Sequence, residues 1–278
     1  MKTIRDIGDE IMARFAEAEL KPRLKCQRCG KFEALDIAWN DPPICEPCGT
    51  DAERKSAEQQ SLDKFHERRK ASAFPPRFYK ARFADFTECA ADPRYSKHQQ
   101  AVARRVFECC QSDSGKGILL IGPSSTGKTH LLAAAANKIL VHKPLLWLDG
   151  NSLKRQLAAD TFAKSADALD RPPFGQRVAA EFSAVVLDEF TFDKSTNYDW
   201  LQDGFMGFLN DLTAYGEVKL FISSNNPLEG LLTDPVTGKP DRSDGLPNLA
   251  SLFKERGTSR LIQLVTPIHL TGPNRRLH

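Results

Sequence analysis

The sequence feature that most constrains the fold is a glycine-containing motif near the middle of the chain. Residues 122–129 read Gly-Pro-Ser-Ser-Thr-Gly-Lys-Thr, the pattern G-x-x-x-x-G-K-[ST]. The motif follows the apolar run 117–121 and precedes a helical stretch at 130–140. When such a loop joins a strand to a helix, its backbone N–H groups and the positive end of the helix point at the same place, where a phosphate can bind. The motif therefore predicts a phosphate-binding loop in an α/β fold.

The chemistry of this loop predicts a bound nucleotide with Mg²⁺. The lysine at 128 is expected to reach the β- and γ-phosphates, and the hydroxyl of Thr129 is expected to bind Mg²⁺. The residues expected to contact the nucleotide are Gly122, Pro123, Ser124, Ser125, Thr126, Gly127, Lys128, Thr129 and His130.

Two later apolar runs end in polar residues that suit hydrolysis. The run 184–187 is followed by Asp188 and Glu189. We expect Asp188 to hold Mg²⁺ through water and Glu189 to orient and deprotonate the attacking water. The run 220–222 leads into Ser-Ser-Asn225, where the asparagine is expected to contact the γ-phosphate or that water. The adjacent acids favour ATP hydrolysis over phosphoryl transfer to a small molecule, which needs no water-activating acid.

Short apolar runs alternate with helical stretches from residue 93 onward, which predicts a parallel sheet in an α/β fold. A helix is predicted at 94–111, before the first strand. The expected strands are Ile118–Ile121, Leu145–Leu148, Ala184–Leu187, Lys219–Ser223 and Ile262–Leu270. Residues 227–248 are rich in Pro, Gly and Asp, which predicts a surface loop.

Four cysteines near the N-terminus have the spacing of a metal site. Cys26, Cys29, Cys45 and Cys48 form C-x2-C-x15-C-x2-C, and each pair is followed directly by glycine. Two such turns complete a tetrahedron of thiolates around Zn²⁺. A closed four-sulfur site leaves no position for substrate, so the zinc is expected to be structural. Cys89, Cys109 and Cys110 are expected to be core or surface thiols.

The chain divides into three parts by pattern. Residues 1–50 combine a predicted amphipathic helix at 1–22 with the zinc-binding module, residues 51–82 form a basic helical linker, and residues 83–278 form the ATPase domain. Within 64–82, seven Lys and Arg residues face a single acid, with four aromatic residues interleaved. This segment either contacts a nucleic-acid backbone and stacks bases, or it is a solvated linker helix.

Composition narrows the classes of protein. The chain has 278 residues, of which 41% are hydrophobic and 27% are charged, and its net charge is +3. These values exclude a largely disordered chain and a polycation. No apolar run approaches the length of a membrane helix, and the N-terminus lacks the apolar region of a signal peptide. Seven cysteines, an odd number, favour reduced thiols, so we expect a cytoplasmic protein without membrane partners.

The order of these motifs resembles a known family. Gly-x4-Gly-Lys-Thr-His-Leu, Leu-Asp-Glu and Ser-Ser-Asn together resemble the AAA+ ATPases, and within them the DnaC/DnaI helicase loaders and the IstB transposition ATPases. The pair His130-Leu131 and the segment 74–86, Phe-Pro-Pro-Arg-Phe-Tyr followed by Phe-x-x-Phe, carry the resemblance further. It covers about residues 74–276. It implies a five-stranded parallel sheet in the order 5-1-4-3-2, with ATP bound between the subunits of an oligomeric spiral.

The resemblance also implies roles for several arginines. A neighbouring subunit is expected to supply an arginine finger, for which Arg256 in Glu-Arg and Arg260 in Ser-Arg-Leu are the candidates. Arg275 or Arg276, after Gly-Pro-Asn, is expected to sense the nucleotide within the same subunit. Lys154 and Arg155 are candidate DNA contacts by family position, and a charged helix face is the alternative.

Three functions fit these features. The first is a helicase loader that binds the hexameric replicative helicase through residues 1–50 and single-stranded DNA through the ATPase domain. The second is an IstB-like helper that assembles on duplex DNA and recruits a transposase. The third is a nucleotide-gated switch with little hydrolysis, or a small-molecule kinase. The separate zinc-binding module favours the loader.

Overall fold

The structure is a computed structural model. It describes residues 23–25, 32–34, 51–88, 93–112, 115–162, 171–192, 199–215, 217–230, 233–234, 236–239, 246–273 and 275.

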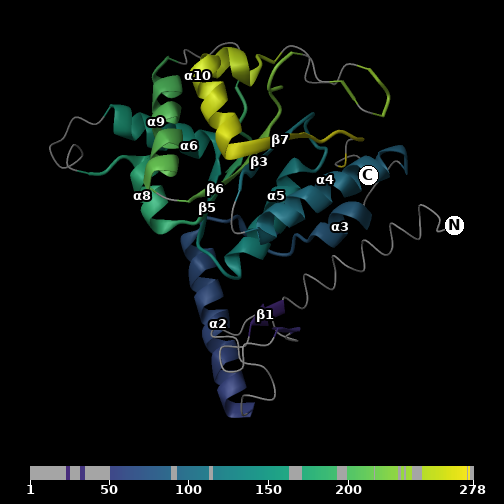
Figure 1. Cartoon of the computed structure of the whole chain (residues 1–278), viewed down its shortest axis with the longest axis vertical. Coiled ribbons are helices and arrows are strands. Elements are labelled where there is room, and N and C mark those ends of the chain that lie inside the picture. The colour runs from purple at the N-terminus through teal and green to yellow at the C-terminus, as the bar shows by residue number, and fades with distance from the viewer. Residues whose placement is uncertain are drawn as a thin grey trace.

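A parallel sheet forms the centre of the fold (Figure 1). Its five strands are β3 (Gly117–Ile121), β4 (Leu145–Asp149), β5 (Ala184–Asp188), β6 (Lys219–Ser224) and β7 (Val265–His269). They lie in the order β4-β5-β6-β3-β7, and all neighbours are parallel. Counted along the chain, this is the order 5-1-4-3-2, so the predicted α/β class and strand order are confirmed. The strand that leads into the 122–129 loop is flanked by β6 and β7.

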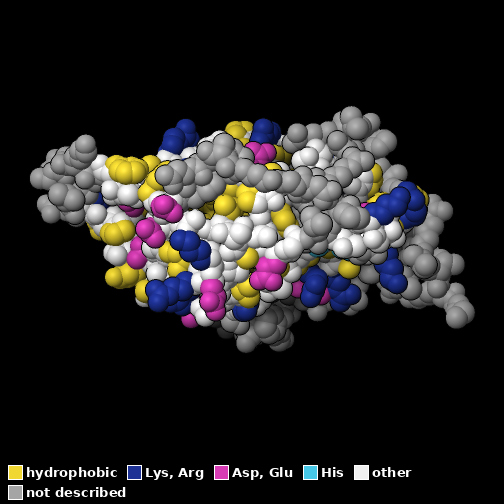
Figure 2. Space-filling view, turned by 90° about the horizontal axis from the view of Figure 1, so that it is seen from above, with side chains coloured by type: hydrophobic (Ala, Val, Ile, Leu, Met, Phe, Trp, Pro, Cys, Tyr) yellow, Lys and Arg dark blue, Asp and Glu magenta, His cyan; other side chains and the backbone are white. Residues whose placement is uncertain are grey.

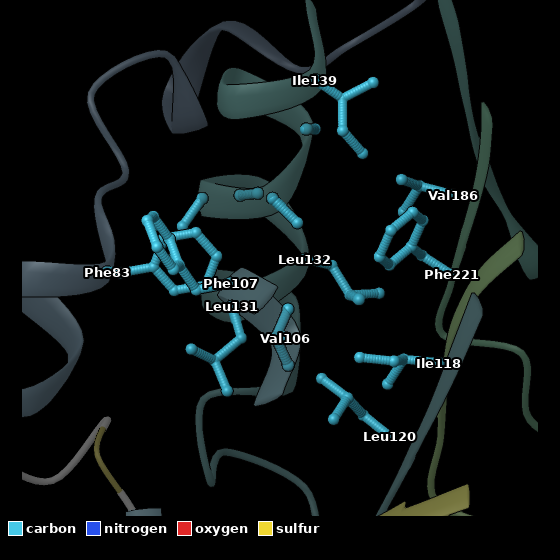
Figure 3. Close-up of a cluster of buried hydrophobic side chains, with 14 of the residues drawn as sticks. Phe83, Val106, Phe107, Ile118, Leu120, Leu131, Leu132, Ile139, Val186 and Phe221 are labelled. Atoms are coloured by element: carbon cyan, nitrogen blue, oxygen red, sulfur yellow. The ribbon is translucent and has the colours of Figure 1, made fainter. Parts of the chain in front are cut away.

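Three helices cover one face of this sheet, the face to which Ile118 and Leu120 of β3 point. The helices are α3 (Phe83–Glu88), α4 (Pro93–Gln111) and α5 (Lys128–Leu140). Figure 3 shows Leu132 of α5 facing Ile118, Leu120 and Phe221 of the sheet. Because successive strand residues point to opposite faces, Ile118 and Leu120 belong to this core while the residues beside them do not.

The other face packs against helices from later in the chain. These helices are α6 (Gly150–Thr161), α8 (Phe174–Glu181), α9 (Asp199–Tyr215) and α10 (Leu249–Leu264). Leu119 and Ile121 point to this side, as the alternation predicts. Phenylalanine rings fill the centre of the cluster, with Phe190 and Phe205 at a centroid separation of 4.7 Å. Two separate cores therefore hold the sheet in place from both sides.

Helix α2 (Asp51–Ala71) extends away from the sheet and is docked at its C-terminal end (Figure 1). Nη1 of Arg68 donates to the carbonyl of Val141 at 2.6 Å, beyond the end of α5. The N–H of Trp147 in β4 donates to the carbonyl of Ser72 at 2.7 Å. The helix ends at Ala71, and Ala73, two residues later, takes a positive φ of 55° that a right-handed helix does not accommodate. The single-turn helix η2 (Pro76–Phe78) follows.

Two of the four aromatic residues at 64–82 are packing residues, which corrects the base-stacking alternative for those two. Phe65 and Phe74 are buried, and the Phe74 ring lies 5.1 Å from that of Trp147. The guanidinium of Arg69 lies near the rings of Phe65 and Tyr79, at 4.1 and 4.2 Å. The buried rings of Phe65 and Phe74 cannot stack on bases, because they already contact protein, whereas Phe78 and Tyr79 are half-buried.

The last strand begins later than its apolar run predicted. Residues 262–264 continue α10, and β7 starts at Val265. An apolar run by itself does not separate the end of a helix from the start of a strand. Leu261 is buried from the helix, whereas the β-branched pair Val265-Thr266 opens the strand. Helix α10 also contains a kink at Lys254, where φ is 55° and ψ is −177°.

The described residues of 227–248 are exposed or half-buried except for Pro227, and Asp234 forms hydrogen bonds that hold this loop. This carboxylate accepts hydrogen bonds from the N–H groups of Val236 and Thr237 and from the hydroxyls of Tyr95 and Thr271. Burial alone would raise the pKa of Asp234, but these hydrogen bonds lower it below its ordinary value. The loop is therefore tied to α4 and to the chain beyond β7.

Within residues 1–50, the structure describes two short antiparallel strands, β1 (Arg23–Lys25) and β2 (Phe32–Ala34), with Leu24 opposite Glu33. The predicted helix at 1–22 and the four cysteines of the predicted zinc module lie outside the described residues. Among the helices that are described, none is long and apolar enough to cross a membrane.

Candidate functional site

The 122–129 loop joins the end of β3 to the start of α5, as the motif predicted. Gly127 precedes the helix with a φ of +103°, a left-handed conformation that favours glycine. A Cβ at this position would lie 2.5 Å from Cε2 of Phe86, so a side chain here would clash. Among the described residues, no side chain caps the N-terminus of α5. The first N–H groups of α5 are therefore not capped by a side chain, and uncapped N–H groups at a helix N-terminus are the arrangement that binds anions.

Lys128 lies folded over the loop in this structure. Its Nζ donates to the carbonyls of Gly122 at 2.7 Å and Pro123 at 2.6 Å, and the residue is 7% exposed. A buried ammonium requires such partners, because its desolvation is costly. The charge is therefore concentrated at the mouth of the loop, within reach of any phosphate bound there.

Thr129 at the start of α5 contacts Asp188 at the end of β5. The Thr129 hydroxyl donates to Oδ1 of Asp188 at 2.9 Å, and Asp188 is 4% exposed at the end of β5. The carboxyl ends of parallel strands share one edge of a sheet, which explains why residues so far apart in sequence lie together. Both side chains offer oxygen atoms, the ligands that Mg²⁺ prefers. The donor set fits a Mg²⁺ site.

Glu189 and Asn225 lie at the same edge, on neighbouring chain segments. Glu189 is exposed and has a φ of 53°, a left-handed conformation that is strained for a glutamate. Its N–H donates to the Ser223 hydroxyl at 2.9 Å. Asn225 follows β6 and donates its N–H to the Thr191 hydroxyl at 3.3 Å. Within the described part of the chain, the amide side chain of Asn225 forms no hydrogen bond, so it can serve a ligand.

Helix α6 starts beside the acids. Its N-terminus is capped by Asp149, whose carboxylate accepts hydrogen bonds from the N–H and hydroxyl of Ser152 at 2.7 and 3.0 Å. Burial alone would raise the pKa of Asp149, but the bonds from Ser152 lower it. A Cβ on Gly150 would lie 2.6 Å from the carbonyl oxygen of Glu189, so only glycine lets the helix approach this closely.

The C-terminal segment lies against the loop. The N–H of Arg275 donates to the carbonyl of Ser125 at 2.9 Å. Its guanidinium donates to the carbonyl of Phe86 and to Oε1 of Gln99, both at 2.6 Å, and lies 4.0 Å from the Phe86 ring centroid. Arg275 thus reaches the loop through its backbone while its side chain faces α3 and α4. Arg276 lies outside the described residues.

The side chains of His130 and Arg260 form hydrogen bonds with residues outside the 122–129 loop, and Arg256 is exposed. Nε2 of His130 donates to the carbonyl of Arg82 at 2.9 Å. Arg260 donates to Asn210 at 3.0 Å and to Gln263 at 2.9 Å. Arg256 is exposed in the turn after the α10 kink, and it forms no hydrogen bond or ion pair with another described residue. Arg256 is therefore the finger candidate that a neighbouring molecule can reach.

An aromatic pair lies on the surface at the end of α6. Phe162 is 58% exposed, and its ring centroid lies 5.6 Å from that of Trp200. Earlier in α6, Arg155 is exposed, whereas the Lys154 ammonium lies 5.0 Å from the Phe192 ring centroid. On the face shown in Figure 2, basic and acidic side chains are interspersed. The exposed ring of Phe162 is therefore the feature that marks the end of α6.

A cavity of about 1090 Å³ lies at the opposite edge of the sheet, near the start of β3 and β6. Two of its lysines neutralise the C-terminal ends of helices: Nζ of Lys116 donates to the carbonyl of Ile262, and Nζ of Lys219 donates to the carbonyl of Cys109. Cys110 also lines it, and burial raises the pKa of that thiol. The cavity is separate from the 122–129 loop.

Among the described residues, no group of three or more His, Cys, Asp and Glu side chains is arranged to hold a metal ion. The four cysteines at 26, 29, 45 and 48 lie outside those residues. The zinc site stays a prediction.

Comparisons with known proteins give structural similarity alone. No protein-family model matches the sequence, and no curated protein is similar to it. A crystal structure of DnaI is 22% identical with a TM-score of 0.48, covering 73% of this chain and 95% of that one. A crystal structure of the DnaC helicase loader is 17% identical with a TM-score of 0.49, covering 71% of this chain and 100% of that one. AMPPCP-bound DnaA from Aquifex aeolicus is 16% identical with a TM-score of 0.47, covering 73% and 53%.

Proposed function

We propose that the chain binds ATP at the 122–129 loop, hydrolyses it with the acids at the end of β5, and acts as a helicase loader. The observation that carries the ATPase proposal is the contact between Thr129 and Asp188 at 2.9 Å. It joins the loop, which precedes α5, to the strand that ends in both acids. The loop amides, Lys128 and the two oxygen donors thereby face one point.

The residues at this edge have distinct tasks in the proposal. Lys128 turns from the carbonyls of Gly122 and Pro123 to the phosphates, which offer stronger, charge-assisted hydrogen bonds. Thr129 and Asp188 would hold Mg²⁺, which would supply positive charge to neutralise the phosphates.

Glu189 and Asn225 act on the attacking water. The exposed Glu189 carboxylate accepts a proton from the water, and the Asn225 amide orients it. Arg256 of a neighbouring subunit is the proposed arginine finger. Its positive charge stabilises the negative charge that develops on the γ-phosphate during hydrolysis. Hydrolysis then depends on assembly.

We assign the contact with DNA to the end of α6. Base stacking on aromatic rings is independent of sequence and requires unpaired bases. The exposed ring of Phe162, with the half-buried Trp200 beside it, offers such a surface, and Arg155 on the same helix offers a charge for a phosphate. This pair favours single-stranded DNA, and hence a loader, over a helper that assembles on duplex DNA.

The loader proposal also rests on the sequence resemblance and on the separate N-terminal module. Residues 1–50 would dock on the hexameric replicative helicase while the ATPase domain holds the single strand. ATP hydrolysis would then load or release the helicase.

The test is a mass measurement. The protein is mixed with ATP, Mg²⁺ and the replicative helicase of its host, and the mass of the complex is read by light scattering. We expect a stable complex that disappears when residues 1–50 are deleted. The absence of a complex, together with ATP-dependent filaments on duplex DNA, would instead favour the transposition helper.

A further inference from the structure

Ser223 contacts both acids of the candidate site from the neighbouring strand. It is 1% exposed in β6, next to β5 in the sheet. Its hydroxyl donates to Oδ1 of Asp188 at 2.6 Å and accepts the N–H of Glu189 at 2.9 Å. A hydroxyl has one donor and two acceptor positions, so a single side chain can serve both residues at once.

The contact with Asp188 fixes the orientation of its carboxylate. Oδ1 of Asp188 accepts a hydrogen bond from the hydroxyl of Ser223 and another from the hydroxyl of Thr129. With Oδ1 held by two hydroxyls, Oδ2 keeps its lone pairs for a ligand. Hydrogen-bond partners of this kind orient metal-binding carboxylates and increase their affinity for the metal.

The contact with Glu189 holds a strained backbone. Glu189 has a φ of 53°, and such conformations persist only where the surroundings determine them. The Ser223 hydroxyl accepts its N–H, and the Ser223 carbonyl accepts the N–H of Phe190 at 2.8 Å. Ser223 therefore sets the direction in which the Glu189 side chain leaves the strand end.

We propose that Ser223 is a positioning residue that holds Asp188 and Glu189 in register for Mg²⁺ binding and water activation. The inference rests on the proposed ATPase function and goes beyond it, because it assigns a task to a side chain that touches neither nucleotide nor water. Its neighbour Ser224 provides the contrast. Ser224 is equally buried, but its hydroxyl donates to the carbonyl of Phe190 and accepts the N–H of Asn226.

The test compares Ser223→Ala, Ser223→Thr and the control Ser224→Ala in the full chain. Three quantities are measured: kcat and KM for ATP, the affinity for the fluorescent nucleotide mant-ADP with and without Mg²⁺, and the thermal midpoint. For Ser223→Ala we expect kcat to fall about 10- to 100-fold, the range found when outer partners of metal ligands are removed. Mg²⁺-free mant-ADP affinity should stay within about twofold of the wild type, while the gain in affinity on adding Mg²⁺ shrinks.

The two other variants separate positioning from packing. Ser223→Thr keeps the hydroxyl and should restore kcat and the Mg²⁺-dependent gain. Ser224→Ala should leave both unchanged, even where its thermal midpoint falls. Wild-type kcat and Mg²⁺ dependence in Ser223→Ala would overturn the inference, and so would equal losses in both Ala variants. A wild-type chain that binds mant-ADP but does not hydrolyse ATP would refute the ATPase proposal, and the Mg²⁺-dependent gain would still decide the role of Ser223.

Discussion

At the scale of single residues, direct contacts hold Lys128, Thr129 and Asp188 at the candidate site. The Thr129 hydroxyl donates to the Asp188 carboxylate, and the Lys128 ammonium donates to the carbonyls of Gly122 and Pro123 in its own loop. In the proposed function, a bound phosphate would take the place of these carbonyls as the partner of Lys128.

Removal of the loop lysine should weaken nucleotide binding. In Lys128→Ala, the hydrogen bonds from an ammonium to the phosphates are lost, and bonds to charged groups are worth about 1.5–3 kcal/mol. We expect ATP affinity to fall roughly 10- to 150-fold in a fluorescence titration. Lys138→Ala, at the other end of the same helix, serves as the matched control and should bind ATP normally. Equal affinities of Lys128→Ala and the wild type would contradict the assignment of the loop.

The two asparagines after β6 should have separable roles. Asn226 is fully buried, accepts the N–H of Phe192 and donates to the carbonyls of Phe192 and Pro247. Asn226→Ala leaves these groups unpaired and should cost about 2–4 kcal/mol of unfolding free energy. Asn225→Ala should stay within about 0.5 kcal/mol in stability.

The rate of ATP hydrolysis should be affected more by Asn225→Ala than by Asn226→Ala, the reverse of their effects on stability. Asn225→Ala should slow ATP hydrolysis roughly 10- to 100-fold, because a positioned water is lost. Chemical denaturation and steady-state kinetics on both variants give the two quantities. If Asn226→Ala slows turnover while retaining full stability, the contact with water belongs to Asn226 instead. The sequence pattern Ser-Ser-Asn-Asn could not separate the two, because both asparagines follow the same strand.

At the scale of elements, the five strands were predictable because each is an apolar run between helical stretches. The nature of the 64–82 segment was not. Its basic and aromatic residues left a nucleic-acid surface and a solvated linker helix as alternatives, whereas the rings of Phe65 and Phe74 pack against the core. Burial depends on what faces a helix, and a single helix sequence does not contain that information. The kink at Lys254 was likewise invisible, since no proline or glycine lies at that residue.

Two phenylalanines test this element-scale account. Phe74 is 3% exposed and packs on Trp147, so Phe74→Ala should lower the unfolding free energy by about 3–5 kcal/mol. Phe162 is exposed, so Phe162→Ala should change stability by less than about 0.5 kcal/mol. Denaturant unfolding measures both.

The same two variants should differ in DNA binding. Stacking of one base on an aromatic ring is worth about 1–3 kcal/mol, so Phe162→Ala should weaken binding of a fluorescent oligo-dT roughly 5- to 150-fold. Phe74→Ala, measured where it is folded, should bind oligo-dT as the wild type does. Unchanged oligo-dT affinity in Phe162→Ala would remove α6 from the proposed DNA surface.

At the scale of the whole molecule, the strand order 5-1-4-3-2 brings the ends of β3, β5 and β6 together at one edge. The family resemblance predicted this order, whereas apolar periodicity gave only the strands. Arg256 is exposed on α10, and its role toward a neighbouring subunit is a proposal.

The arginine finger is testable by mixing variants. Arg256→Ala should bind ATP normally but lose about 10³-fold or more in assembly-dependent turnover. Arg260→Ala should retain turnover, because its side chain is already bound to Asn210 and Gln263. Arg256→Ala mixed with Lys128→Ala should regain activity, since some interfaces then pair an intact loop with an intact arginine. Inactivity of Arg260→Ala with normal turnover of Arg256→Ala would move the finger to Arg260.

The central claim is that the loop at 122–129 and the acids at the end of β5 form an ATP-hydrolysing site. The measurement is phosphate release by the full chain with ATP, Mg²⁺ and oligo-dT, set beside nucleotide affinity in the same preparations. The account predicts turnover by the wild type. It also predicts that Glu189→Gln binds ATP with wild-type affinity and releases phosphate at least about 100-fold more slowly, because the group that accepts the proton is gone. Wild-type turnover in Glu189→Gln, or ATP binding without any hydrolysis by the wild type, would contradict it.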